Sequence, residues 1–170
     1  MKKKIADMKS VKISLSIVLL SLVIILSSCK KDRPVLDPPG SKLEGINATW
    51  SLTEVVQVDV ASIQQKKLNV STAFVGSTPL VMTFNSSDFT YTVTKGSGPN
   101  YFGDGGSWAF DDNEYPTQIT LTPNSGAPKV LPMLHTIRPV DTYLNFMYSR
   151  TCANDQDPYI AYEFKFVRSN

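Results

Sequence analysis

From Trp50 onward, apolar and polar side chains alternate at every second residue, and this pattern constrains the fold more than any other feature of the sequence. Alternation with a period of two is typical of β-strands that bury one face. No segment sustains an apolar period of 3.6 residues, so a helical or α/β architecture has little support. We expect an all-β domain with eight strands. These cover residues 49–60, 80–84, 89–94, 107–110, 118–122, 130–138, 144–148 and 160–166.

Local turns join most of these segments, and this connectivity bears on the choice of architecture. Residues 85–88 (Asn-Ser-Ser-Asp), for example, separate two strands as a hairpin turn. An eight-stranded up-and-down antiparallel barrel fits best because closure removes exposed sheet edges, with a two-layer sandwich as the second choice. A barrel of about eight strands is either just filled by its own side chains or holds one small ligand. The function depends on which of these two interiors is present.

The amino terminus has the composition of an export signal. Five lysines between Lys2 and Lys12 precede an uncharged apolar run over residues 13–26, and the sequence LSSC follows at residues 26–29. As a helix the run would be about 21 Å long, against a hydrocarbon core of about 30 Å, so it is short for a permanent span. The LSSC sequence resembles the lipobox of bacterial lipoproteins. We therefore predict cleavage after Ser28 and attachment of diacylglycerol and palmitate to Cys29, with an uncleaved anchor helix as the alternative.

Cleavage at that point would define three regions: a signal peptide at residues 1–28, a lipidated tether at 29–44 and a barrel domain at 45–170. Residues 30–42 are rich in charge and proline, which favours a flexible tether. The signal peptide holds five of the 17 basic and one of the 15 acidic residues, so its loss changes the formal charge from +2 to −2. We therefore exclude nucleic acid as a partner. The expected location is the cell envelope, lipid-anchored at the outer membrane of a Gram-negative bacterium.

Residue types that carry out catalysis or bind metals are sparse. Acylation of Cys29 would leave Cys152 without a partner in the chain, and we expect it to act as a small apolar residue. The single histidine, His135, cannot build a histidine-rich metal site. The acidic groups at residues 111–114 and 155–157 do not follow calcium-loop spacing, and there is no Gly-x-Ser-x-Gly elbow or phosphate-binding loop. We expect no enzymatic activity, no cofactor and no bound metal.

Residues 61–78 form an unusually long connection between the first two strands. Leu68, Val70, Phe74 and Val75 are its apolar residues that could face the barrel. The segment could be a lid over the barrel mouth, with these side chains touching a ligand. It could equally be a loop or short helix that plugs the barrel end and completes the core.

Two short motifs resemble a known family. INATWSL at residues 46–52 looks like the opening of lipocalin-like domains, and GGSWAF at 105–110, followed by ITL at 119–121, is similar to their middle hairpin. The match, over residues 45–168, is to a lipocalin-like domain family of Gram-negative lipoproteins. It implies that a small apolar or amphipathic molecule binds inside the barrel. Candidate lining residues, each with core packing as its alternative, are Trp50, Phe89, Tyr91, Trp108, Phe110, Phe146, Tyr148, Tyr162 and Phe164.

Glu54 is the one acidic residue at an inward position of the first strand. It lies between Leu52 and Val56, and an inward carboxylate must be paired, neutral or hydrated. Our hypothesis is that Glu54 pairs with Arg138 or Arg150 inside the cavity, where the pair could orient a polar group of a ligand. The alternative is a local bulge that turns Glu54 to solvent.

Two functions from different classes follow. The first, which we favour, is a membrane-anchored binding protein for a small apolar or amphipathic molecule. The second is an envelope interaction protein that engages another protein through its outer face or loops.

Overall fold

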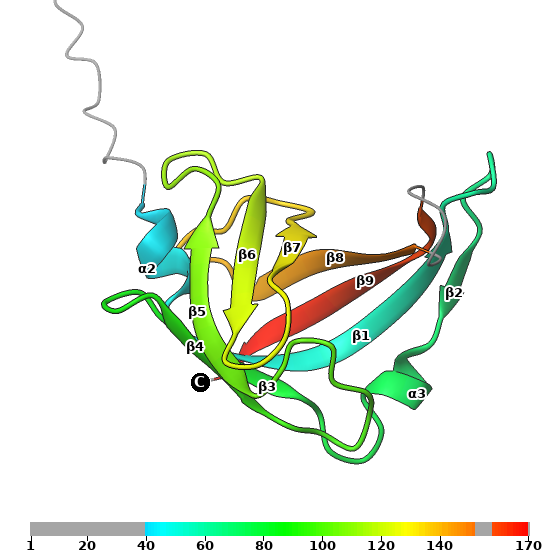
Figure 1. Ribbon diagram of the computed structural model, residues 1–170, viewed down its shortest axis with the longest axis horizontal. Coiled ribbons are helices and arrows are strands. Elements are labelled where there is room, and N and C mark those ends of the chain that lie inside the picture. The colour runs from blue at the N-terminus through cyan, green and yellow to red at the C-terminus, as the bar shows by residue number, and fades with distance from the viewer. Residues whose placement is uncertain (1–39, 152–157, 170) are drawn as a thin grey trace, which may run out of the picture. The chain divides into compact units, whose positions relative to one another are not determined.

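The barrel is seen in a computed structural model that describes residues 40–151 and 158–169. They belong to one compact unit, Pro39–Asn170, whose strands are drawn in Figure 1. This unit has its own hydrophobic core. The predicted signal peptide, Cys29, most of the tether and Cys152 lie outside the described residues. Among the described helices, none is long and apolar enough to cross a membrane. The elements are α2 (Lys42–Ile46), β1 (Thr49–Asp59), β2 (Lys67–Asn69), α3 (Ser71–Phe74), β3 (Val81–Asn85), β4 (Thr90–Thr94), β5 (Gly105–Phe110), β6 (Gln118–Pro123), β7 (Lys129–Pro132), β8 (Tyr143–Thr151) and β9 (Pro158–Ser169).

The strands form a single antiparallel sheet that curls into a nearly closed barrel, which confirms the predicted fold class. Its order is β7-β6-β5-β4-β3-β1-β9-β8, so neighbours in sequence are neighbours in space and β1 pairs with β9. The short strand β2 pairs only with β1 and lies off this path. Between β7 and β8 the barrel is joined by one bridge, Met133 to Phe146, and by a hydrogen bond from Leu134 N to Asn145 O at 3.1 Å. We call this sparsely bonded junction the seam.

The first strand contains a bulge that changes which of its residues face inward. Leu52 pairs with Phe166 and Glu54 with Lys165, so Thr53 is an extra residue on β1. An extra residue shifts the alternation by one position. Val55 is therefore fully buried in the core, whereas the predicted inward position at Val56 is only half-buried.

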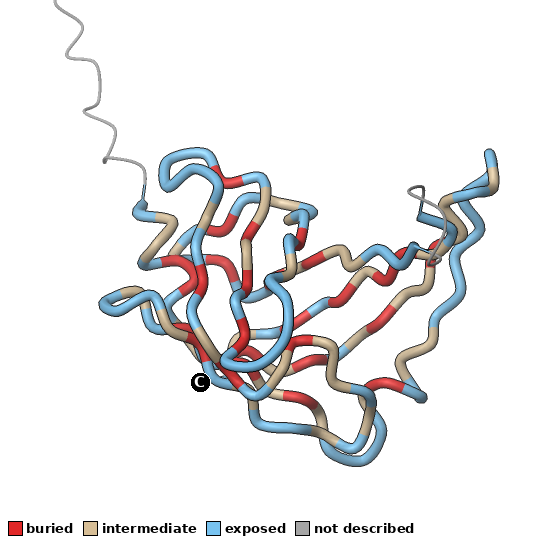
Figure 2. Tube along the Cα trace, viewed as in Figure 1, coloured by how far each residue is buried: buried red, intermediate tan, exposed pale blue. Residues whose placement is uncertain are grey.

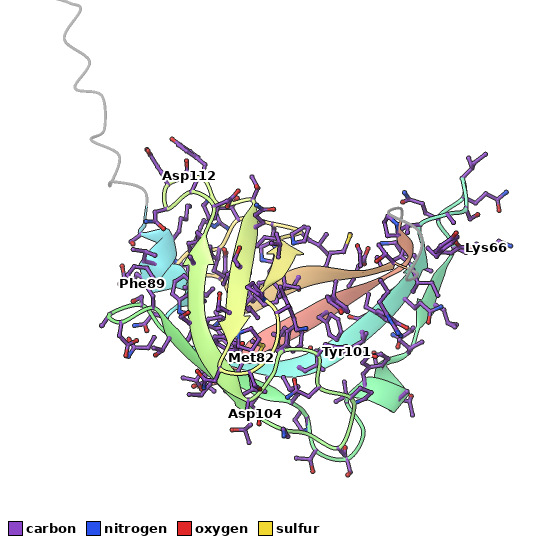
Figure 3. The ribbon with its side chains drawn as sticks, in the orientation of Figure 1. Lys66, Met82, Phe89, Tyr101, Asp104 and Asp112 are labelled. Atoms are coloured by element: carbon purple, nitrogen blue, oxygen red, sulfur yellow. The ribbon has the colours of Figure 1, made fainter. Side chains whose placement is uncertain are left out.

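Two other strands differ from the prediction at their ends. β7 ends at Pro132 and does not continue to residue 138, because proline has no N–H for the ladder and a single bridge follows it. β4 begins at Thr90, and the preceding Phe89 has a φ of 56°. The expected inward position of Phe89 is wrong: its ring lies against Trp108 at the barrel edge and is 38% exposed (Figure 3).

One end of the barrel is sealed by α2, a helix that lies partly in the predicted tether. Ser41 caps it by accepting a hydrogen bond from Glu44 N at 3.4 Å. Trp50, at the start of β1, donates from Nε1 to the carbonyl of Ile46 at 3.0 Å, which ties the helix to the barrel. Both Trp50 and Ile46 are fully buried. This end of the barrel is closed.

Arg168 completes the closure from the last strand. Its guanidinium lies over the Trp50 ring, 4.9 Å from the centroid. It also donates to the carbonyls of Gly45 at 2.6 Å and Pro139 at 2.8 Å. No larger residue fits at position 45, because a Cβ there would lie 2.8 Å from the backbone of Arg138.

The barrel interior is filled with side chains over most of its length, because one cluster of buried apolar residues draws on nearly every barrel strand. Figure 2 shows where the buried residues lie along the chain. Aromatic rings are numerous in the interior, and some neighbouring rings pack edge to face, as Phe84 does on Trp108 and Phe102 on Phe164. The largest fully buried side chains include Trp50, Tyr91, Phe84, Phe102, Phe146, Phe164 and Phe166.

Candidate binding site at the open end of the barrel

The long neighbouring strands β8 and β9 build the site as a series of inward cross-strand pairs. The two pairs nearest the sealed end are buried, the third carries two hydroxyl groups, and the last holds an exposed arginine. Polarity therefore rises from the sealed end to the open end along a single face of the sheet. In that order the pairs are Leu144 with Phe166, Phe146 with Phe164, Tyr148 with Tyr162, and Arg150 with Ile160.

The long connection after β1 plugs the barrel interior. Phe74, at the end of α3, is 7% exposed and packs against Tyr162 at 5.3 Å and Phe164 at 5.9 Å between ring centroids. Val70 and Val75 are partly buried against the same core. Leu68 is 61% exposed in β2, so its assignment to the inner side of this segment is wrong. The segment as a whole matches the plug alternative.

A second loop, between β4 and β5, adds Tyr101 to the site. The Tyr101 ring stacks on Phe74 at 5.9 Å and on Tyr162 at 6.2 Å, and it lies 5.4 Å from Tyr148 (Figure 3). Tyr101 was not among the predicted lining residues, because it lies in a glycine-rich stretch without alternation. The one available signal was the aromatic pair of Tyr101 and Phe102 in an otherwise polar loop.

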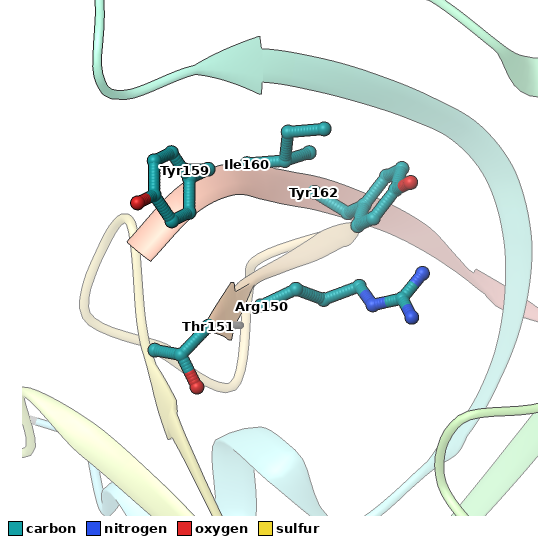
Figure 4. A pocket seen from close by; sticks show the side chains of 5 residues that line it. All are labelled: Arg150, Thr151, Tyr159, Ile160 and Tyr162. Atoms are coloured by element: carbon teal, nitrogen blue, oxygen red, sulfur yellow. The ribbon is translucent and has the colours of Figure 1, made fainter. Parts of the chain in front are cut away.

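Two cavities open beside this aromatic cluster. The first, of about 170 Å³, lies where β8 ends and β9 begins (Figure 4). Its lining residues are Arg150, Thr151, Tyr159, Ile160 and Tyr162. The second, of about 440 Å³, lies across the seam between β7 and β8. Its lining residues are Ala127, Pro128, Lys129, Val130, Pro132, Tyr148 and Ser149. Tyr162, which lines the first cavity, and Tyr148, which lines the second, are cross-strand partners.

The polar groups around the cavities are cations and hydroxyls. Lys129 Nζ lies over the Tyr148 ring, 5.9 Å from its centroid. Arg150 and Tyr162 extend in the same direction from neighbouring strands (Figure 4). Within the described part of the chain, neither Lys129 nor Arg150 takes part in an ion pair. This end therefore combines an aromatic floor with two cations at its rim.

Four of the predicted lining residues lie deeper, in the filled core. Trp50 is held by Ile46 as described above, and Trp108 donates from Nε1 to the carbonyl of Thr90 at 3.0 Å. Tyr91 donates from its hydroxyl to the carbonyl of Phe102 at 2.7 Å, and burial raises its pKa to about 12. The fourth residue, Phe146, is fully buried. Core packing accounts for these four residues, whereas Tyr148 and Tyr162 border the cavities.

Glu54 does not form the predicted internal ion pair. The bulge places it beside Lys165, with 3.4 Å between Oε2 and Nζ, and its side chain is 39% exposed. Arg138 instead binds Asp141, with 2.9 Å between Nη2 and Oδ1. Arg150 lies on an inward position of β8, as the hypothesis required, but without Glu54. The bulge alternative is the one observed.

The acidic partner of Arg138 and the single histidine lie away from the cavities. Asp141 is 7% exposed, and although burial alone would raise its pKa, hydrogen bonds from Arg138 hold that pKa below its ordinary value. His135 Nε2 lies 3.1 Å from the carbonyl oxygen of Tyr143, and its ring packs on the Tyr143 ring at 4.5 Å. These contacts are structural: they fix the turn before β8.

The fold and the cavities together define a class: a nearly closed, eight-stranded antiparallel barrel, sealed and filled at one end and open at an aromatic site at the other. No known protein-family model matches the chain, and no curated protein matches it. The resemblance to lipocalin-like lipoproteins stays a prediction from the sequence.

Proposed function

We propose that this protein is a lipid-anchored envelope protein that binds a small amphipathic molecule at the open end of its barrel. The observation that carries the binding proposal is the change along β8 and β9 from buried apolar pairs to a tyrosine pair beside two cavities. Ligand sites are concave, mostly apolar and supplied with a few placed polar groups. The cavity at the seam, about 440 Å³, is within the size range of small-molecule sites, about 300–1,000 Å³.

The filled core limits where such a molecule can lie. Phe74, Phe102 and Phe164 are buried in the core, where the first two pack against the third, so a ligand would bind at the mouth and not deep inside. Its apolar part would contact the rings of Tyr101, Tyr148 and Tyr162. Each well-placed aromatic contact contributes about 0.5–1.5 kcal/mol beyond the burial of area.

A fluorescence titration of residues 39–170 with the neutral dye N-phenyl-1-naphthylamine tests this site, because that unit contains the whole described core. Tyr148→Ala should weaken dye binding by about 3- to 10-fold through loss of an aromatic contact. The matched control is Tyr143→Ala, which removes a 43% exposed tyrosine from the same strand. A dye that does not saturate the wild type, or equal effects of the two variants, would contradict the proposal. If the dye binds as expected, organic extraction of the purified protein followed by mass spectrometry would identify a natural ligand.

The anchor is tested separately, in cells given an alkyne analogue of palmitate. Cys29→Ser should abolish labelling, whereas Cys152→Ser, the other cysteine of the chain, should leave it unchanged. Labelling that persists in Cys29→Ser would refute the lipoprotein assignment without affecting the binding proposal.

One observation favours the second function, an envelope interaction protein. Tyr143 and Val167 form a cross-strand pair that is 43% and 37% exposed, and Val140 is 78% exposed in the turn before β8. Exposed apolar groups that gather on one surface are typical of contact sites. Crosslinking in intact cells from position 143 to a single protein partner would favour this function.

A further inference from the structure

We propose that the molecule bound at the open end is an organic anion, and that Arg150 and Lys129 hold its negative group. This inference rests on the proposed binding function and names the chemical class of the ligand. Each cavity has one cation in its lining, Arg150 in the smaller and Lys129 in the larger, and neither lining includes a carboxylate. A site with this composition favours ligands of negative charge.

The contrast with other cations of the barrel supports this assignment. Lys67 lies 2.7 Å from Glu163 and Arg138 lies 2.9 Å from Asp141, so these charges are already neutralised by the protein. Among the described residues, no carboxylate forms such a pair with Lys129 or Arg150. Within residues 40–151 and 158–169, the two cations at the open end therefore keep a charge that an external anion could neutralise.

The positions of the two cations also suit one ligand. Lys129 begins β7 and Arg150 lies near the end of β8, so they flank the seam from opposite sides. Tyr148 lies between them: its ring is 5.9 Å from Lys129 Nζ, and it precedes Arg150 by two residues on the same face of β8. A ligand whose apolar body contacts the Tyr148 ring would thus have a cation on each side of that body for its negative group.

The chemistry of the two side chains narrows the class further. Guanidinium groups present a planar fork that matches the paired oxygens of a carboxylate, sulfonate or phosphate, whereas an ammonium acts as a mobile point charge. The hydroxyls of Tyr148 and Tyr162 can donate to the same oxygens. The expected ligand is an amphipathic organic anion, with an apolar or aromatic body on the tyrosines and its acidic group at the rim.

Two dyes with the same ring system separate this inference from the proposed function. 1-Anilinonaphthalene-8-sulfonate carries a sulfonate that N-phenyl-1-naphthylamine lacks. In a protein of residues 39–170, the double variant Lys129→Gln/Arg150→Gln should lower the affinity for the sulfonated dye about tenfold or more, because charge-assisted hydrogen bonds are lost. The neutral dye should bind within about twofold of its wild-type affinity, since the aromatic contacts remain. The control, Lys42→Gln/Lys66→Gln, removes the same charge from exposed or half-buried positions outside both cavities and should leave both dyes unchanged.

The outcomes distinguish the two claims. If the neutral dye does not saturate the wild type, the proposed binding function fails. If the neutral dye saturates but the double variant weakens both dyes equally, or neither, only the charge inference is overturned. Salt provides a second measurement without any substitution. Raising the ionic strength from 0.05 to 0.5 M should lower the affinity for the sulfonated dye and leave that for the neutral dye unchanged. A sulfonated dye insensitive to salt would also overturn the inference.

Discussion

Alkaline pH should destabilise the barrel through one buried hydroxyl, that of Tyr91. The side chain is 1% exposed, and burial raises its pKa to about 12 from an ordinary value of 10.0. In the unfolded chain Tyr91 would ionise near pH 10, whereas in the folded barrel it would keep its proton up to about pH 12. The unfolded state therefore loses its proton first as the pH rises. The contribution of Tyr91 to stability is complete below pH 10 and is lost between pH 10 and 12.

The magnitude follows from the size of this shift. With pKa values of 10 and 12, the free energy of unfolding should fall by about 1.4 kcal/mol between pH 8 and pH 11. Tyr91→Phe removes the titrating group and costs about 1–3 kcal/mol at pH 8, because the carbonyl of Phe102 loses its donor. The stability difference between wild type and Tyr91→Phe should therefore shrink by about 1.4 kcal/mol at pH 11.

Urea unfolding followed by circular dichroism at pH 8 and pH 11 measures this difference directly. Comparison of each variant with wild type at the same pH cancels the titration of every other tyrosine and lysine. Tyr143→Phe is the matched control, since it removes the hydroxyl group of a tyrosine that is 43% exposed. A gap for Tyr91→Phe that is equal at the two pH values, or that changes as much for Tyr143→Phe, would refute the reasoning.

Three further predictions concern the plug, the seal and the bulge, and all are measured as urea unfolding free energies at pH 7. Phe74→Ala should lower the free energy of unfolding by about 3–5 kcal/mol, because it empties a buried site among aromatic rings. Phe89→Ala, which removes a 38% exposed ring, should lower it by about 1 kcal/mol. Equal losses would contradict the role of Phe74 as a plug. Arg168→Leu should cost about 2–4 kcal/mol, since two backbone carbonyls lose their donor, and a loss below 1 kcal/mol would contradict the seal. Glu54→Gln should change stability by less than about 1 kcal/mol because its pair with Lys165 is exposed, and a larger loss would indicate a buried carboxylate.

The proposed site depends on the incomplete closure of the barrel at the seam. Elsewhere the strands pair over several residues each, but β7 and β8 share one bridge. Pro128 and Pro132 contribute to this, because neither has a backbone N–H to offer to β8. The gap leaves room for the larger cavity, and Lys129 lies between these two prolines at its edge. The same residues therefore limit strand pairing and line the proposed binding site.

Alternation by itself determined the all-β class and the approximate position of all eight barrel strands. Successive residues of a strand face the core and the solvent in turn, so the pattern is visible in the local sequence. It also placed Tyr148 and Tyr162 on the inner face, and these are the predicted lining residues that border the cavities. It could not distinguish them from Trp50 or Trp108, since buried and pocket-lining aromatics have the same pattern.

Only the tertiary structure decided the register and the fill of the interior. The bulge at Thr53 adjusts β1 to β9, a strand more than 100 residues away in sequence, and it turned Glu54 outward. Phe74, at the end of the short helix α3, and Tyr101, in a loop, enter the core from segments without alternation, and their positions depend on rings of other segments of the chain. A local pattern records which face a side chain prefers. It does not record which distant side chains pack into the same part of the interior. That packing leaves the barrel filled at one end and open at the other.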